Sequence, residues 1–176
     1  MRLPPGQAIA IITLLAVLLV MAGEAVLASF NERVLLARGA REAPDDVYRT
    51  MRWAYPGCFV MMAIEGAWRG PSPPTVLLGG LALFGLSKAL KAWAIATLGP
   101  RWTFKVIVPT EPSLITSGPY RLLNHPNYVA VVGELLGFAA IVFAPITGVV
   151  ALIGFGSLMR ARIRVEDRAL GRAESR

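Results

Sequence analysis

Cysteine, histidine and charge are scarce in this sequence, and each scarcity excludes a class of protein. The 176 residues include one cysteine, Cys58, and one histidine, His125, so no disulfide can form within the chain. One histidine and one cysteine also fall short of the usual zinc ligand sets, so we expect no metal site. Charged residues make up 16% of the chain, against about a quarter in a typical soluble domain.

Apolar residues, in contrast, are abundant and come in long runs. They make up 55% of the chain, and the mean hydropathy is +0.57. The net charge of +7 does not indicate nucleic acid, because the basic residues lie between the apolar runs and in the tail, as membrane topology requires. No polar low-complexity linker interrupts the runs, so we expect a single membrane domain over residues 1–176.

Three hydrophobic runs predict membrane-spanning helices within residues 1–97. They cover residues 7–29, 53–68 and about 75–97. A run of about 20 apolar residues crosses the hydrocarbon core as a helix, and Trp53 and Trp68 end the second run where interfacial aromatic residues lie. The first run is too long for the core of a signal peptide, so we expect it to be retained as a span.

Residues 98–176 predict a cofactor-binding loop, a helical hairpin and a tail. Five prolines and several charges in residues 98–127 predict a structured loop, and long loops in small proteins tend to be functional. Apolar arms at 128–143 and 146–158, with a tip at Ala144-Pro145, predict the hairpin, and the tail that follows predicts an amphipathic helix. The fold class is therefore all-α: a polytopic membrane bundle of about five transmembrane helices.

The basic residues predict the orientation of this bundle. With five helices and the N-terminus outside, sixteen of the eighteen Lys and Arg lie on the inner side. Five are in the first connection, five are in the end of the third run and the long loop, and six are in the tail. Only Arg2 and Arg69 lie outside. The positive-inside rule therefore predicts that the long loop and the tail share the cytoplasmic face.

The hairpin brings the end of the loop and the start of the tail together at one membrane surface. The loop supplies Tyr120, His125 and Tyr128, and the tail supplies Arg162 and Glu166, which are four residues apart and share a helix face. Imidazole, phenol, guanidinium and carboxylate groups beside an apolar bundle suit a site where a polar cofactor meets a lipidic substrate.

Simpler interpretations of the same residues stay open. His125 is alternatively a loop histidine held by the backbone, with Asn127 capping the next helix. Arg162 and Glu166 are alternatively an exposed helix pair worth a few tenths of a kcal/mol.

Charged residues within the apolar runs are costly and are often functional. Glu134 lies two turns beyond His125 and is predicted to face the pocket as a substrate-binding group, and Glu24 lies close to the cytoplasmic end of its span. Lys88 and Lys91 are predicted to reach the inner surface with their long side chains, with contact to an anionic group of the cofactor as the alternative. A snorkelling ion pair is predicted for Glu65 and Arg69.

Glycines in the third run predict close helix packing. They are Gly79, Gly80 and Gly85.

Three segments together resemble the isoprenylcysteine carboxyl methyltransferases and the related membrane phospholipid methyltransferases. They are Gly-Pro-Tyr-Arg at 118–121, Asn-His-Pro-Asn-Tyr at 124–128 and Arg-Ile-Arg-Val-Glu-Asp at 162–167. The three occur in the family's order, with a hairpin between the last two, and the resemblance covers roughly residues 98–170. The sequence departs from the family pattern at Asp167, where a second glutamate is usual.

The resemblance implies that S-adenosylmethionine binds between the loop and the tail. Arg162 would lie at the boundary with the substrate, and Arg162 and Glu166 would take part in catalysis. The implied cofactor-binding residues are Tyr120, His125, Pro126, Tyr128 and Glu166.

Residues 31–39, Asn-Glu-Arg-Val-Leu-Leu-Ala-Arg-Gly, resemble a bacterial branch of the family that acts on lipidic acceptors such as alkylated polyketide rings. The resemblance thus implies an enzyme of the bacterial inner membrane that O-methylates a carboxyl or hydroxyl group of a lipidic, isoprenoid-like or alkylated acceptor. A carboxylate acceptor needs no base, whereas a phenol or enol would gain from one, with His125 or Glu166 as candidates. Two alternatives are an NADPH-dependent membrane reductase of the sterol-reductase type and a non-catalytic membrane scaffold.

Overall fold

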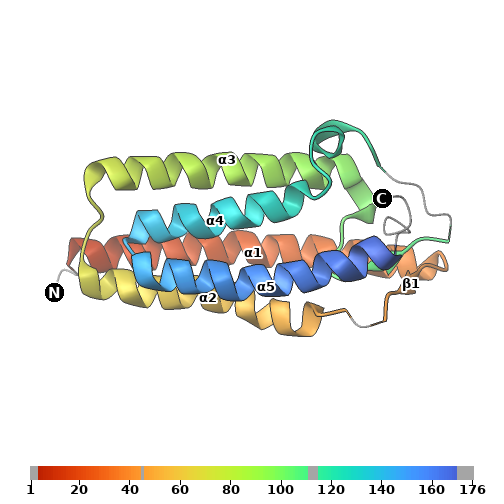
Figure 1. Cartoon of the computed structure of the whole chain (residues 1–176), viewed down its shortest axis with the longest axis horizontal. Helices are drawn as coiled ribbons and strands as arrows, with labels where there is room; N and C mark the ends of the chain where they lie inside the picture. Colours follow the sequence, from red (N-terminus) through yellow and green to blue (C-terminus); the bar gives the residue numbers. More distant parts are fainter. Residues whose placement is uncertain (1–3, 45, 111–114, 170–176) are drawn as a thin grey trace.

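Five long helices run side by side in the computed structural model, which describes residues 4–44, 46–110 and 115–169 (Figure 1). Within these ranges the helices are α1 (Pro5–Ala37), α2 (Tyr48–Arg69), α3 (Pro74–Leu98), α4 (Pro126–Val142) and α5 (Pro145–Ala169). Two short strands, β1 (Arg41–Glu42) and β2 (Ile107–Val108), and two 3₁₀ turns, Gly99–Arg101 and Gly118–Arg121, complete the described structure. The predicted all-α membrane bundle is confirmed.

Prolines set where several helices begin. Pro74, Pro126 and Pro145 each occupy the first position of a helix, where the missing N–H costs nothing and the fixed φ favours the helical turn. The hairpin tip lies where the sequence predicts it. α4 ends at Val142 and is followed by Phe143, which has a left-handed φ of 58°, and the Ala144 N–H donates to the Ala139 carbonyl at 2.8 Å.

Three helices, α1, α3 and α5, are long and apolar enough to cross a membrane in the described part of the chain. α4 is apolar but has 17 residues, and α2 carries an internal Pro56. The predicted tail is helical up to Ala169, but it is the continuation of the second hairpin helix, because α5 runs without a break from Pro145 through the basic segment. Residues 170–176 of the predicted tail lie outside the described ranges. α1 and α2 also extend beyond their predicted apolar runs, since their polar ends pack against the long loop.

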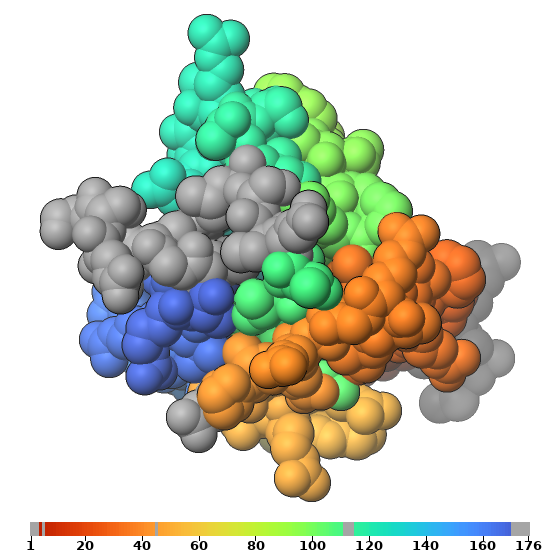
Figure 2. Space-filling model, turned by 90° about the vertical axis from the view of Figure 1, so that its right-hand side faces the viewer, coloured from red at the N-terminus to blue at the C-terminus, as the bar shows by residue number. Residues whose placement is uncertain are grey.

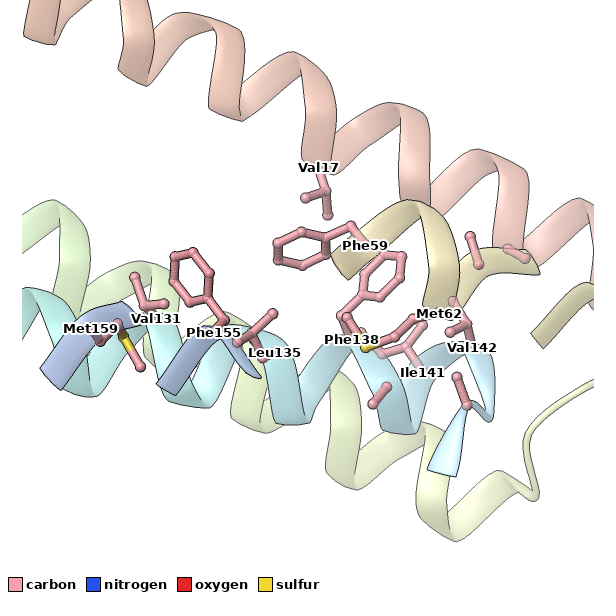
Figure 3. Close-up of a cluster of buried hydrophobic side chains, with 14 residues drawn as sticks. Val17, Phe59, Met62, Val131, Leu135, Phe138, Ile141, Val142, Phe155 and Met159 are labelled. Carbon is pink, nitrogen blue, oxygen red and sulfur yellow. The ribbon is translucent and has the colours of Figure 1, made fainter. Parts of the chain in front are cut away.

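Aromatic and aliphatic side chains fill the centre of the bundle (Figure 3). Phe59 of α2 meets the ring of Phe138 of α4 edge-on at 4.9 Å, and both are fully buried. Many large apolar side chains instead point outward from the bundle, as a lipid-facing surface requires. Examples are Leu15, Leu19, Val26, Leu78, Leu86, Val150 and Ile153.

Small residues let α3 and α4 approach closely, and α3 packs more extensively against α4 than against any other described helix. A Cβ on Gly80 would lie 2.9 Å from the carbonyl oxygen of Gly137, and a Cβ on Gly137 would lie 2.7 Å from the Phe84 nitrogen. The packing prediction is therefore confirmed for Gly80. It is wrong for Gly79 and Gly85, which face open space on other sides of α3.

The loops that carry the predicted site gather at one end of the bundle. The N-terminal end of α1, the α2–α3 turn and the hairpin tip lie at the opposite end (Figure 1). Figure 2 looks onto the loop end, where the segment carrying β2 (green) lies between α5 (blue) and the α1–α2 connection (orange). This clustering agrees with the charge pattern of the sequence, while the side of the membrane that it faces stays a prediction.

Residues of the 31–39 segment fix the long loop in place. The Asn31 side chain donates to the carbonyl oxygen of Trp102 at 2.8 Å, and Lys105 forms ion pairs with Glu32 and Glu42 at 2.8 and 3.0 Å. Hydrogen bonds to Glu32 and then Glu42 raise the pKa of Lys105 to about 12. β1 and β2 pair antiparallel beside these contacts, so the described parts of the first connection and of the long loop form one cap.

Candidate functional site

A cavity of about 580 Å³ lies beneath this cap, bounded by all five helices and the long loop. This volume is typical of small-molecule and cofactor sites. Six residues that the sequence singles out line it together, although they come from segments about 40 residues apart. They are Tyr120, His125, Pro126, Tyr128, Arg162 and Glu166.

Tyr128 is the centre of the polar group at the cavity mouth. Its hydroxyl donates to Glu166 Oε2 and accepts from Arg162 Nε, both at 3.0 Å. Arg162 and Glu166 are one turn apart on α5, so the helix directs both side chains at the same phenol oxygen of α4. The predicted shared face is therefore observed, with Tyr128 between the two charged groups.

Asp46 completes this group and was missed from the sequence. Its carboxylate accepts from Arg162 Nη1 at 2.7 Å and from the backbone N–H groups of Val106 and Tyr48 at 2.8 and 3.0 Å. The Asp46 side chain is 4% exposed, so Arg162 neutralises a buried charge. No local pattern signals this pair, because 116 residues separate the partners.

His125 lies at the rim of the cavity, immediately before α4. Its Nε2 lies 3.3 Å from Asp167 Oδ1, and its ring centroid is 5.6 Å from that of Tyr128. Asp167, the residue that departs from the family pattern, therefore reaches His125. The alternative that Asn127 caps α4 is wrong: the N-cap position is His125 and no side chain caps it.

Tyr120 reaches the cavity because the 3₁₀ turn Gly118–Arg121 docks against the end of α3. Gly118 has a φ of +56°, and a Cβ there would lie 2.4 Å from the Thr97 hydroxyl oxygen. Glycine therefore meets both the backbone and the packing requirement at this position.

A second polar group lies deeper and includes residues that the sequence treats separately. Glu134 is fully buried, and both Lys88 and Lys91 lie within 3.2 Å of its carboxylate and within 3.2 Å of that of Glu24. The Tyr55 hydroxyl also donates to Glu134. The prediction that both lysines extend to the inner surface is wrong, because carboxylates from α1 and α4 hold them inside the bundle.

Glu24, Tyr55 and Lys91 of this deeper group line the cavity, whereas Glu134 lies behind them. Its predicted contact with a substrate stays a prediction. The sequence did indicate that these residues are unusual, because four charged side chains lie within apolar runs. The assembly was not predictable, because it depends on how four helices, α1 to α4, are rotated about their axes. Elsewhere, Glu65 does pair with Arg69 as predicted, and it also accepts from the backbone N–H of Thr147 at the start of α5.

The innermost wall of the cavity is apolar. It is formed by Leu18, Met21, Pro56, Val131 and Phe155. Tyr55 lies seven residues beyond Tyr48 on α2, which places it about 10 Å deeper at the helical rise of about 1.5 Å per residue. The cavity thus passes from a charged mouth, through the deeper polar group, to a hydrocarbon-like floor.

The donors and acceptors of the cavity fit S-adenosylmethionine. The side-chain oxygen of Asn127 is buried and has no hydrogen-bond partner among the described residues, so it offers an acceptor to an amine. Glu166 and the rings of Tyr120 and Trp102 suit a cation. In the described part of the chain, no three His, Cys, Asp or Glu side chains form a group that could hold a metal ion.

The family model of the isoprenylcysteine carboxyl methyltransferases matches residues 80–172, just over half of the chain. The chain belongs to the isoprenylcysteine carboxyl methyltransferase family. The match covers most of α3, the long loop, α4 and α5, and therefore contains every site residue that the sequence predicts. Together with the three long apolar helices, membership identifies an integral membrane protein of a methyltransferase family.

Curated relatives of this family member are bacterial. The uncharacterized protein YpbQ of Bacillus subtilis is 30% identical over 89% of the chain and 94% of its own length. The cobalt-zinc-cadmium resistance protein CzcN of Cupriavidus metallidurans is 34% identical over 62% of the chain and 45% of its own length. An uncharacterized protein of Haemophilus influenzae is 25% identical over 80% of the chain and 82% of its own length. No solved structure matches the chain.

Proposed function

We propose that this family member transfers the methyl group of S-adenosylmethionine to a carboxyl or hydroxyl oxygen of a lipophilic acceptor. The observation that carries the proposal is the convergence of loop and tail residues on one cavity whose floor is apolar. The polar mouth suits the cofactor and the floor suits an alkyl or isoprenoid chain. The two ligands would then meet near the deeper polar group.

The residues at the mouth have distinct roles in this proposal. Tyr120, His125, Pro126, Tyr128 and Glu166 hold the cofactor, which supplies a methyl group already activated on a positive sulfur. Glu166 contributes negative charge, and Tyr128 is kept in position by its hydrogen bonds to Glu166 and Arg162. Arg162 borders the acceptor. The principal task of these residues is to align donor and acceptor in a site that excludes water.

The proposed location is the inner membrane of a bacterium, with the N-terminus outside and the site in the cytoplasm. The excess of Lys and Arg in the segments at the loop end supports this orientation. The bacterial relatives support the choice of membrane. Cytoplasmic exposure would also give the site access to a soluble cofactor, while the acceptor would arrive from the bilayer.

Methyl transfer tests the proposal directly. Purified protein in detergent, given S-adenosylmethionine with a labelled methyl group and a panel of alkylphenols and long-chain fatty acids, is expected to label at least one lipid. Glu166→Gln should lower the rate about 10- to 100-fold, because it removes a charge-assisted hydrogen bond.

Arg164→Gln is the matched control, since Arg164 is exposed and lies between Arg162 and Glu166 on the same helix. Its rate should stay within about twofold of wild type. If no lipid in the panel is labelled and the same preparation oxidises NADPH, the protein is a reductase and the proposed methyl transfer is wrong.

A further inference from the structure

The deeper polar group is electrically balanced as it stands. Lys88 and Lys91 contribute two positive charges, and Glu24 and Glu134 contribute two negative charges, with every lysine–carboxylate distance at or below 3.2 Å. Buried charges are costly unless they are paired. Two lysines beside the two carboxylates therefore leave room for a carboxylate of the group to accept a proton while the other remains paired.

Tyr55 connects this group to the cavity. Its hydroxyl donates to Glu134, while no described residue donates to the hydroxyl oxygen, so that oxygen can accept a hydrogen bond from a ligand. Its ring is fixed by Phe59 and Phe155, with centroids at 5.0 and 4.9 Å. Glu134 is in turn fixed by the two lysines. The geometry is that of a two-step proton path from the cavity to a buried carboxylate.

We propose that Tyr55 accepts a hydrogen bond from a hydroxyl group of the acceptor and relays its proton to Glu134. This inference rests on the proposed methyl transfer and narrows its acceptor to a weakly acidic hydroxyl, a phenol or an enol, on an apolar chain. A carboxylate acceptor has no proton to donate to Tyr55, whereas a hydroxyl group has one and must lose it when it is methylated. Tyr55 is then a catalytic residue and Glu134 a positioning residue that receives the proton.

The step balances in atoms and charge. The acceptor oxygen forms a bond to the methyl carbon, and the methyl–sulfur bond breaks with its electron pair remaining on sulfur. The acceptor proton passes to the Tyr55 oxygen as the Tyr55 proton passes to Glu134. The positive charge lost from sulfur is therefore replaced by one excess positive charge in the group of Lys88, Lys91, Glu24 and neutral Glu134.

The charged groups around the path are few. Glu24 approaches from α1 and both lysines from α3, while α5 contributes the uncharged Phe155. On α2 itself, the titratable residues one turn from Tyr55 are Arg52, which also lines the cavity, and Cys58. With the path intact, the rate is expected to change little between pH 7 and 9. Without it, the acceptor must ionise in water first, and the rate should rise about tenfold per pH unit below the acceptor's own pKa.

Tyr55→Phe tests the relay with little risk to the fold, because it keeps the ring contacts and all four ion pairs. Calorimetry would measure the binding of 3-pentadecylphenol, its methyl ether and 3-pentadecylbenzoate to protein saturated with S-adenosylhomocysteine. Wild type should bind the phenol about tenfold more tightly than the ether or the benzoate. In Tyr55→Phe the phenol and the ether should bind equally, with affinity for S-adenosylhomocysteine unchanged.

Two further variants keep the test specific. Tyr48→Phe removes another hydroxyl from the cavity wall and should retain the preference for the phenol over the ether. Glu134→Gln should keep that preference but show the steep pH dependence of methyl transfer. Tighter binding of the benzoate than of the phenol, or a pH profile unchanged in both Tyr55→Phe and Glu134→Gln, would overturn the relay. Failure of wild type to bind S-adenosylhomocysteine would instead remove the methyl transfer on which the relay rests.

Discussion

Replacement of Arg162 by methionine is expected to destabilise the protein by about 3–5 kcal/mol, because it leaves the buried Asp46 carboxylate without its counterion. Asp46 would keep the backbone N–H groups of Val106 and Tyr48, which do not neutralise it. Tyr128 would also lose one of its two polar contacts. In detergent the unfolding midpoint should fall by roughly 10 °C, and affinity for S-adenosylhomocysteine should fall at least tenfold.

The double variant Asp46→Asn with Arg162→Met separates the two effects. Removing both charges should restore most of the lost stability, since a neutral amide is less costly to bury than an unpaired carboxylate. Cofactor affinity should remain low, because the contact of Arg162 with Tyr128 is still missing. Equal unfolding midpoints for Arg162→Met and wild type would contradict the assignment of this pair as a buried contact between the cap and α5.

Gly80→Val is expected to disrupt the bundle by separating α3 from α4. The new side chain would collide with backbone atoms, the Gly137 carbonyl oxygen and the Ile141 nitrogen, which cannot rotate away as a side chain can. Overpacking of this kind costs about 1–3 kcal/mol even where side chains yield, so we expect a loss at the upper end of that range or beyond. Thermal unfolding and size-exclusion chromatography in detergent would measure it.

Gly79→Val provides the matched control for this substitution. Gly79 is the adjacent residue of the same helix, and a Cβ there meets nothing within 4 Å. Replacing glycine by valine has the same cost in helix propensity at both positions, and at position 79 the new side chain would face lipid. Comparable destabilisation by the two variants would show that helix propensity, rather than the α3–α4 contact, determines the effect.

The bundle was predictable from sequence because apolar runs of span length have few other solutions. Pro145 indicated the position of the hairpin tip. The ends of α1, α2 and α5 were less predictable, since hydropathy marks the lipid-facing part of a helix and the polar turns beyond it are stabilised by loop contacts. Asn31 illustrates this point: its bond to the Trp102 carbonyl holds the polar end of α1 against the loop.

Site residues within the loop and the tail were accessible through their sequence motifs, whereas their partners were not. Asp46 contacts Arg162 across 116 residues, and no periodic pattern encodes that pairing. Lys91 was predicted to reach the membrane surface because an isolated lysine in a span does so. The opposite outcome follows from Glu24 and Glu134, whose rotational positions on α1 and α4 are set by packing that hydropathy does not report.

Calorimetric titration of the purified protein with S-adenosylhomocysteine, with NADPH in a parallel titration, determines which cofactor the cavity binds. We predict micromolar binding of S-adenosylhomocysteine, weakened at least tenfold in His125→Ala and Glu166→Gln, and no binding of NADPH. Wild-type affinity in both variants would contradict the placement of the cofactor at the cavity mouth. Binding of NADPH alone by folded protein would contradict the proposal that this family member is a methyltransferase.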